Sequence, residues 1–341
     1  MKEDIYITAM GHQYPEHELD NEFFEQLDIG SSASWVEERT GIQRRHSVLS
    51  RDQIQNLRYA QTSVDAMRKN GDVPSASSIV DASWDMLKDR DGCNNIRPDI
   101  VICGTSVPDD YIPAQASLIA DKLKLTGACF DVNSACSSFV TNLSVATAML
   151  KSGVGTSAAI FNVERYTLCL DYTDRKSCVL FGDGAAASLL RRGQRGIRGF
   201  RILDTMIRSD PTGSALVRIP VAGLFSQQGA RVQKFAVSKT CEVSEEMLQK
   251  HALSVSDLDY FIGHQANLRM LTSACQKLGI PDSRHLFNVD KRGNQGAAGA
   301  PAVLSSNWHR FRDGELLLVA VVGSGLTWGA ALLEYCQGSA L

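Results

Sequence analysis

A series of short, continuous apolar segments constrains the fold of this chain more than any other feature. Because they do not alternate with polar residues, they are typical of strands covered by helices on both faces of a sheet. Helical spacing of apolar residues predicts helices over 137–151 and 266–278, each followed closely by a glycine. The alternation of strands and helices predicts a layered α/β protein. The expected strands are 99–104, 128–132, 157–163, 184–190, 258–264, 315–323 and 328–335.

The same order of segments occurs twice along the chain. The matching pairs are 99–104 with 259–264, 130–133 with 287–290, and 182–186 with 327–331. We therefore predict two similar α/β halves, residues 1–195 and 196–341. The segment at about 47–98 has no counterpart in the second half and contains the helix breaker Pro74, so we expect it to form a helical insertion.

Composition narrows the class of protein. The formal net charge of −3 argues against general nucleic-acid binding. No apolar run approaches the length of a membrane span, and the N-terminal residues do not resemble a signal peptide. The nine cysteines lack the paired spacing of a zinc site or a disulfide framework. We expect a cytosolic globular protein.

Cys136 is the first candidate for catalysis. Residues 131–139 run from the end of a predicted strand, through small and polar residues, into a predicted helix. A cysteine at a helix N-terminus meets free N–H groups and the positive end of the helix dipole, which favour the nucleophilic thiolate. The alternative is a small buried hydrophobe, and Cys136 by itself does not decide between them.

Two polar residues in the second half strengthen the catalytic interpretation. His264 lies where a predicted strand ends and a helix begins, although a lone histidine there is more often a capping or core residue. Asn294 lies in a turn rich in glycine and alanine, close to the position that Cys136 holds in the first half. If a pseudo-twofold axis relates the halves, these strand ends converge on one site.

The whole chain also resembles the β-ketoacyl-acyl carrier protein (ACP) synthase III family. The resemblance rests on the joint order and spacing of several motifs. They are residues 35–42, the turn at Cys136, 173–175 followed by 181–184, 264–269, 293–294 and 323–329. It implies a thiolase-like fold, in which two similar α/β halves form a layered αβαβα arrangement, and a homodimer.

The resemblance also implies a reaction. Cys136 would take an acyl group from an acyl-CoA or acyl-ACP, with backbone N–H groups of Cys136 and Ser324 forming the oxyanion hole. His264 and Asn294 would stabilise the enolate formed when a malonyl thioester loses carbon dioxide. The β-ketoacyl product would serve fatty-acid, polyketide or related biosynthesis. Decarboxylation and covalent capture need no metal and no cofactor.

Further residues are assigned to substrate binding by resemblance alone. Trp35, Arg39 and Arg175 would surround the adenine and phosphates of coenzyme A, since a guanidinium both stacks and pairs with phosphate. Each is otherwise a surface ion pair or a partly buried aromatic residue. Lys234 and Arg269 would receive the acidic acyl carrier protein, although lone surface bases are usually only solvated.

The acyl pocket is assigned to Tyr111 and Phe139, with Tyr111 expected to reach a neighbouring subunit. Several segments depart from the fatty-acid starter enzymes. The turn 295–299 lacks the usual threonine and serine, the insertion before Pro98 is long, and residues 107–113 carry paired acids. These departures leave the acyl substrate open, including polyketide, alkylquinolone or biotin-precursor pathways, and leave open whether the extender is carried on ACP or CoA.

Two alternatives from other classes remain. One is an acyltransferase that passes the acyl group from Cys136 to an oxygen or nitrogen nucleophile, with His264 as general base. The other is a non-catalytic subunit of a heterodimeric ketosynthase. A thiolase proper would need a second cysteine in 323–329, which has none. Release of carbon dioxide from a malonyl thioester separates condensation from simple transfer.

Overall fold

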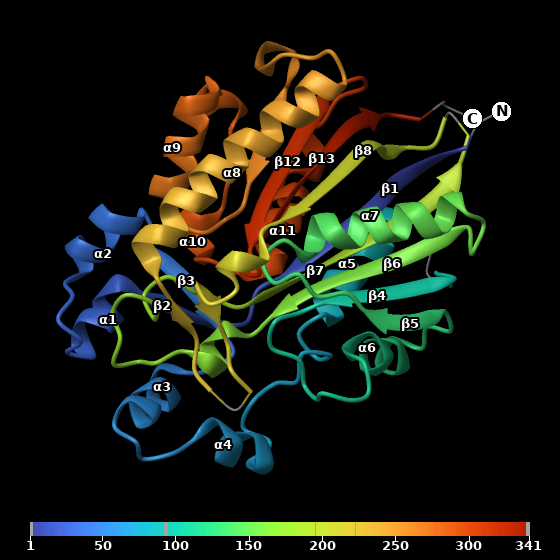
Figure 1. The fold of residues 1–341 in the computed structure, drawn as a ribbon. Coiled ribbons are helices and arrows are strands. Elements are labelled where there is room, and N and C mark those ends of the chain that lie inside the picture. The colour runs from blue at the N-terminus through green and yellow to red at the C-terminus, as the bar shows by residue number, and fades with distance from the viewer. Residues whose placement is uncertain (1–2, 92–94, 195, 222, 339–341) are drawn as a thin grey trace.

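The computed structural model describes residues 3–91, 95–194, 196–221 and 223–338 (Figure 1). Residue 195, where we place the boundary between the halves, lies outside the described residues. The strands are β1 (Asp4–Gln13), β2 (His17–Asp20), β3 (Arg44–Ser47), β4 (Ile100–Gly104), β5 (Ala128–Asp131), β6 (Ser157–Glu164), β7 (Gly184–Gly193), β8 (Gly199–Ser209), β9 (Val217–Arg218), β10 (Ser226–Gln227), β11 (Tyr260–Gly263), β12 (Leu316–Gly323) and β13 (Thr327–Cys336). The helices are α1 (Asn21–Gln26), α2 (Ala33–Thr40), α3 (Arg51–Arg58), α4 (Val64–Asn70), α5 (Asp81–Asp91), α6 (Gln115–Leu123), α7 (Ser138–Lys151), α8 (Gly229–Lys250), α9 (Leu268–Leu278), α10 (Val289–Arg292) and α11 (Gly299–Ser306).

The main sheet has the strand order β11-β12-β13-β8-β1-β7-β6-β4-β5. Its two halves meet at β1 and β8, which pair only through Tyr6 with Arg201 and Ile7 with Phe200. Moving outward from this junction, each half runs antiparallel at first and ends in parallel strands, which are β6, β4 and β5 on one side and β12 and β11 on the other. The structure therefore confirms two similar α/β halves.

The layers explain why the strand segments are continuously apolar. In β12, Leu317, Val319 and Val321 belong to the central core cluster. Leu318 and Ala320 point the other way, into a separate cluster. Since side chains alternate between the two faces of a strand, a sheet that is covered on both faces needs apolar residues at every position.

Helices α7 and α11 form the middle layer. Helix α7 packs on β4 and β6 of the first half and on β8, β12 and β13 of the second. Helices α5 and α6 cover the outer face of the first half, and α8 and α9 cover that of the second (Figure 1). The predicted αβαβα arrangement is thereby confirmed. No helix in the described part of the chain is long and apolar enough to cross a membrane.

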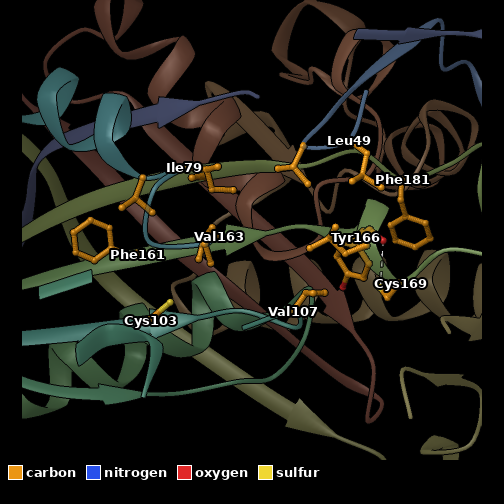
Figure 2. Close-up of a cluster of buried hydrophobic side chains, with 14 of the residues drawn as sticks. Leu49, Ile79, Cys103, Val107, Phe161, Val163, Tyr166, Cys169 and Phe181 are labelled. Carbon is orange, nitrogen blue, oxygen red and sulfur yellow. Dashed lines mark hydrogen bonds between the residues drawn. The ribbon is translucent and has the colours of Figure 1, made fainter. Parts of the chain in front are cut away.

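The predicted helical insertion at about 47–98 contains α3, α4 and α5. Its apolar side chains join the outer core of the first half, where Ile79 packs in one cluster with Phe161 and Val163 of β6. Figure 2 shows that this cluster continues to Tyr166 and Phe181. The insertion therefore supports the segment that follows β6.

One predicted strand is less buried than its composition indicates. Strand β5 is the last in the sheet, and Ala128 and Asp131 are exposed at its ends. Its apolar character is not explained by coverage on both faces within a single chain.

Candidate active site

A cavity of about 550 Å³ lies between the two halves. Strand ends and loops of both halves contribute to its wall. Six of the residues singled out in the sequence line it: Trp35, Arg39, Cys136, His264, Asn294 and Ser324. The structure thus brings together the cysteine, histidine and asparagine that the sequence places far apart.

The turn that carries Cys136 is held in a tight conformation. Ala135 has a positive φ of 51°, and the Ser134 amide donates to Ser138 Oγ at 2.9 Å. Gly323 of the second half packs directly on this turn, because a Cβ there would lie 2.6 Å from the Ser134 carbonyl oxygen and 2.7 Å from the Ser137 amide nitrogen. Glycine therefore allows the loop that carries Ser324 to approach Cys136.

Asn294 is fixed by its backbone and its side chain. Its amide donates to the Leu180 carbonyl at 2.8 Å, and its carbonyl accepts from the Gly182 amide at 3.0 Å. Its side-chain Oδ1 accepts from the Gly296 amide at 2.9 Å. Because this bond holds the oxygen end, the Nδ2 end of the amide remains available as a donor to the cavity.

His264 follows β11, as predicted. The neighbouring Gln265 is fully buried and anchors the turn, with Nε2 donating to the Gly263 carbonyl at 2.8 Å and Oε1 accepting from the Asn288 amide at 3.0 Å. Burial lowers the pKa of His264 to about 4, so the imidazole is neutral at physiological pH. A neutral imidazole retains one N–H and can act as a hydrogen-bond donor.

The electrostatics of Cys136 differ from the sequence prediction. Removal of water by the surrounding protein, together with the nearby carboxyl of Glu164, raises the pKa of the Cys136 thiol to about 12. Burial thus opposes the thiolate that the helix end was expected to favour, because desolvation disfavours the charged form. Acylation requires a group that accepts the thiol proton.

The cavity mouth carries positive charge. The Arg175 guanidinium lies 4.7 Å above the Trp35 ring and donates to the Gly30 carbonyl, so it supports the mouth without lining it. Lys176 and Arg218 line the cavity and were missed in the sequence. Lys176 could have been found from the sequence, because it directly follows the motif at 173–175. Arg218 belongs to no such motif, and the short β9–β10 ribbon brings it to the cavity.

The remaining predicted residues lie outside the cavity. Lys234 on α8 and Arg269 on α9 are exposed, and Arg269 Nε donates to the Glu38 carbonyl at 3.0 Å. Tyr111 is 78% exposed and does not contact the cavity of the single chain. Phe139 is fully buried in the central core cluster. It does not line the cavity of the single chain, and its assignment to the acyl pocket stays a prediction.

An aromatic wall beside Cys136 was not foreseen. The Tyr166 and Phe181 rings stack with their centroids 4.6 Å apart, and Phe225 meets Phe181 edge-on at 4.6 Å. All three line the cavity. Tyr166 comes shortly after the end of β6. A polar residue after a strand end was the signal that identified His264, and the same signal could have identified Tyr166.

Two similar halves in five layers, with a cysteine, a histidine and an asparagine in one cavity between them, define the class of thiolase-fold condensing enzymes. Two protein-family models match the chain, namely 3-oxoacyl-[acyl-carrier-protein (ACP)] synthase III over residues 130–211 and its C-terminal region over residues 248–335.

Relatives extend the match to nearly the whole chain. The β-ketoacyl-[acyl-carrier-protein] synthase III of Xanthomonas campestris is 33% identical over 98% of this chain and 100% of its own. Synthase III 2 of Streptomyces coelicolor is 35% identical over 96% and 93%. The crystal structure of the synthase III from Pseudomonas aeruginosa has a TM-score of 0.86 and 28% identity, with 99% and 100% covered. The chain belongs to the β-ketoacyl-ACP synthase III family.

Family membership confirms the predicted kind of enzyme. The protein is an acyltransferase of the decarboxylating ketosynthase type. The roles of single residues rest on the site geometry.

Proposed function

We propose that the protein loads an acyl group on Cys136 and condenses it with a malonyl thioester to give a β-ketoacyl product. The observation that carries this proposal is the convergence of Cys136, His264 and Asn294 on one cavity, with the amide of Asn294 oriented by Gly296. One cavity serves both half-reactions, so the two thioesters enter in turn.

Acyl transfer is the first half-reaction. The Cys136 sulfur attacks the thioester carbonyl, and the developing oxyanion is stabilised by the backbone N–H groups of Cys136 and Ser324. This assignment is supported by the close approach of the glycine loop to the cysteine turn through Gly323. The Ser324 hydroxyl donates to the Val217 carbonyl at 2.7 Å, which holds the loop in place.

Decarboxylative condensation is the second half-reaction. Loss of carbon dioxide places negative charge on the thioester oxygen of the malonyl group. Neutral His264 and the Nδ2 group of Asn294 donate hydrogen bonds to that oxygen. The carbanion then attacks the acyl carbonyl on Cys136. The low pKa of His264 fits this role, because a neutral imidazole presents a donor without placing a buried cation beside the nucleophile.

Substrate delivery uses the positive mouth of the cavity. Arg39, Lys176 and Arg218 supply charge for the phosphates of coenzyme A, and the Trp35–Arg175 pair supplies a flat surface for adenine. The exposed Lys234 and Arg269 lie on the helices beside this mouth and attract an acidic carrier protein to it. We place the reaction in the cytosol, in keeping with the free thiols of the cysteines that the structure describes.

A homodimer completes the acyl pocket in this proposal. Tyr111 and Ile112 are 78% and 86% exposed on the loop between β4 and α6. Strand β5 ends the sheet close to this loop, since Asp131 accepts from the Gln115 amide at 2.7 Å, and no further strand pairs with its outer edge among the described residues. Exposed apolar side chains next to an open strand edge favour pairing with a second copy of the chain.

The test is to incubate the protein with a panel of acyl-CoA thioesters and to measure the intact mass. Acetyl, medium-chain, branched, aromatic and dicarboxylic groups cover the open substrate classes. We expect a stable mass increase that is absent in Cys136→Ala, followed by release of carbon dioxide when a malonyl thioester is added. Acylation without carbon dioxide from any malonyl thioester would instead identify a simple acyltransferase.

A further inference from the structure

We infer that a chain of two hydroxyl groups connects Cys136 to the buried carboxyl of Glu164 and removes the thiol proton when Cys136 is acylated. This inference rests on the proposed function, since it concerns the first half-reaction at the same cysteine. Its members are Tyr166, Ser106 and Glu164.

The contacts form one continuous path. Cys136 Sγ lies 3.6 Å from Tyr166 Oη. Tyr166 Oη donates to Ser106 Oγ at 3.1 Å. Ser106 Oγ in turn donates to Glu164 Oε1 at 3.1 Å. Because each hydroxyl gives its only proton toward Glu164, the Tyr166 oxygen is free to accept a proton from the thiol.

The carboxyl at the end of the path is suited to accept a proton. Glu164 is fully buried, and the Ser106 amide donates to its Oε2 at 2.9 Å. The Ala297 amide donates to its Oε1 at 3.3 Å. Burial raises the pKa of Glu164 to about 8, so both of its protonation states are accessible near neutral pH. The titratable groups that interact with it electrostatically are Asp183, Cys103, Cys136, Tyr166 and Cys169.

Packing holds the path in place. The Tyr166 ring stacks on Phe181, and its hydroxyl cannot rotate away without breaking the bond to Ser106. Gly296, with φ at 51°, packs against both ends of the path, since a Cβ there would lie 2.5 Å from Tyr166 Cε2 and 3.0 Å from Glu164 Oε1. The turn that carries Asn294 therefore closes over the path.

Acylation moves one proton along this path and back. The Cys136 S–H bond breaks, and the proton passes to Tyr166 Oη while the Tyr166 proton passes to Ser106 Oγ and the Ser106 proton to Glu164 Oε1. The resulting thiolate attacks the thioester carbonyl, and the bond from that carbonyl to the coenzyme A sulfur breaks. The proton returns from Glu164 through the same hydroxyls to the leaving thiolate, so coenzyme A departs as a thiol and Glu164 is ionised again.

His264 is the competing acceptor for this proton. Burial lowers its pKa to about 4, which makes it a weak base at neutral pH, and its Nδ1 has no hydrogen-bond partner among the described residues. Among the described residues the thiol has no hydrogen bond to His264, whereas Tyr166 Oη lies 3.6 Å from the sulfur. The structure therefore separates the roles, with Glu164 handling the thiol proton and His264 acting on the enolate.

The experiment measures single-turnover acylation against pH in wild type, Tyr166→Phe and Glu164→Gln. Both substitutions keep the shape of the side chain. Tyr172→Phe is the matched control, because Tyr172 is also a buried tyrosine that donates one hydrogen bond, to the Thr167 carbonyl at 2.9 Å, but it does not line the cavity. We expect both relay variants to be acylated about 10²-fold more slowly at pH 7, the usual size of a general-base contribution.

The pH profile distinguishes a relay from a structural defect. Wild type should reach a plateau above about pH 8, where Glu164 is ionised, whereas the variants should keep accelerating about tenfold per pH unit as hydroxide replaces the relay. The control Tyr172→Phe, which lies outside the cavity, should keep both the wild-type rate and the wild-type plateau.

Wild-type rates and profiles in Tyr166→Phe and Glu164→Gln would overturn the relay while leaving the proposed function intact. If no thioester acylates the wild type, the proposed function fails instead. The relay is then judged from alkylation of Cys136 by iodoacetamide, which needs no acyl substrate. An identical pH dependence of alkylation in wild type and Glu164→Gln would overturn it.

Discussion

Replacement of Asn294 should separate the two half-reactions. The Gly296 amide holds Oδ1 at 2.9 Å, so Nδ2 is the end that meets the malonyl oxygen. Removing one such donor costs about 2.7–4 kcal/mol of transition-state stabilisation, which is roughly a 10²- to 10³-fold loss in rate. We therefore expect Asn294→Ala to be acylated on Cys136 like wild type but to condense at least about 10²-fold more slowly.

The isosteric variant Asn294→Asp sharpens the test. The Gly296 amide still holds one carboxylate oxygen, so the other oxygen takes the place of the donor and faces the enolate. Repulsion between two negative oxygens adds to the loss of the hydrogen bond, and this variant should condense more slowly than Asn294→Ala. Asn307→Ala is the control, since it loses a bond to the Val303 carbonyl at 2.8 Å outside the cavity.

The assay loads the protein with an acyl-CoA, removes excess thioester by rapid gel filtration and then adds a malonyl thioester. Intact mass reports the acylated fraction, and released carbon dioxide reports the second half-reaction. Condensation by Asn294→Ala at the wild-type rate would refute the assigned role. So would a smaller loss in Asn294→Asp than in Asn294→Ala.

Four further outcomes are expected. Lys234→Glu and Arg269→Glu should weaken the use of carrier-protein substrates more than that of coenzyme A substrates, and added salt should reduce the difference, whereas equal losses would remove both residues from the docking surface. Cys136→Ala should lose acylation yet still release carbon dioxide from a malonyl thioester, because both donors remain; no release would count against the donor assignment. The free energy of unfolding of Glu164→Gln should rise relative to that of wild type between pH 4.5 and about 8. In this range Glu164 keeps its proton in the folded wild type but loses it in the unfolded chain, so wild type loses stability as the pH rises. A difference in the free energy of urea unfolding that stays constant with pH would contradict this. Sedimentation should show a dimer at micromolar concentration, and a stable monomer would argue against a shared acyl pocket.

The layered architecture is predictable from sequence alone, because burial on both faces of a strand requires an apolar residue at nearly every position. The runs 157–163 and 315–323 are continuously apolar and became β6 and β12. The sequence does not predict strand β8, because charged residues interrupt its apolar pattern. One of them, Arg201, forms an ion pair with Glu334 on the adjacent strand β13. A pairing between strands that lie far apart in the chain leaves no comparable local pattern.

The candidate triad could also be proposed from the sequence. Each of its members follows a strand or turn whose position repeats in the two halves, namely Cys136, His264 and Asn294. The state of the thiol and the proposed acceptor of its proton depend instead on contacts between distant segments. Ser106 follows β4 and Glu164 ends β6, and the two meet because these strands are parallel neighbours in the sheet. The pKa of Cys136 depends on how much water the assembled halves exclude and on that carboxyl, which are properties of packing that no stretch of sequence encodes locally.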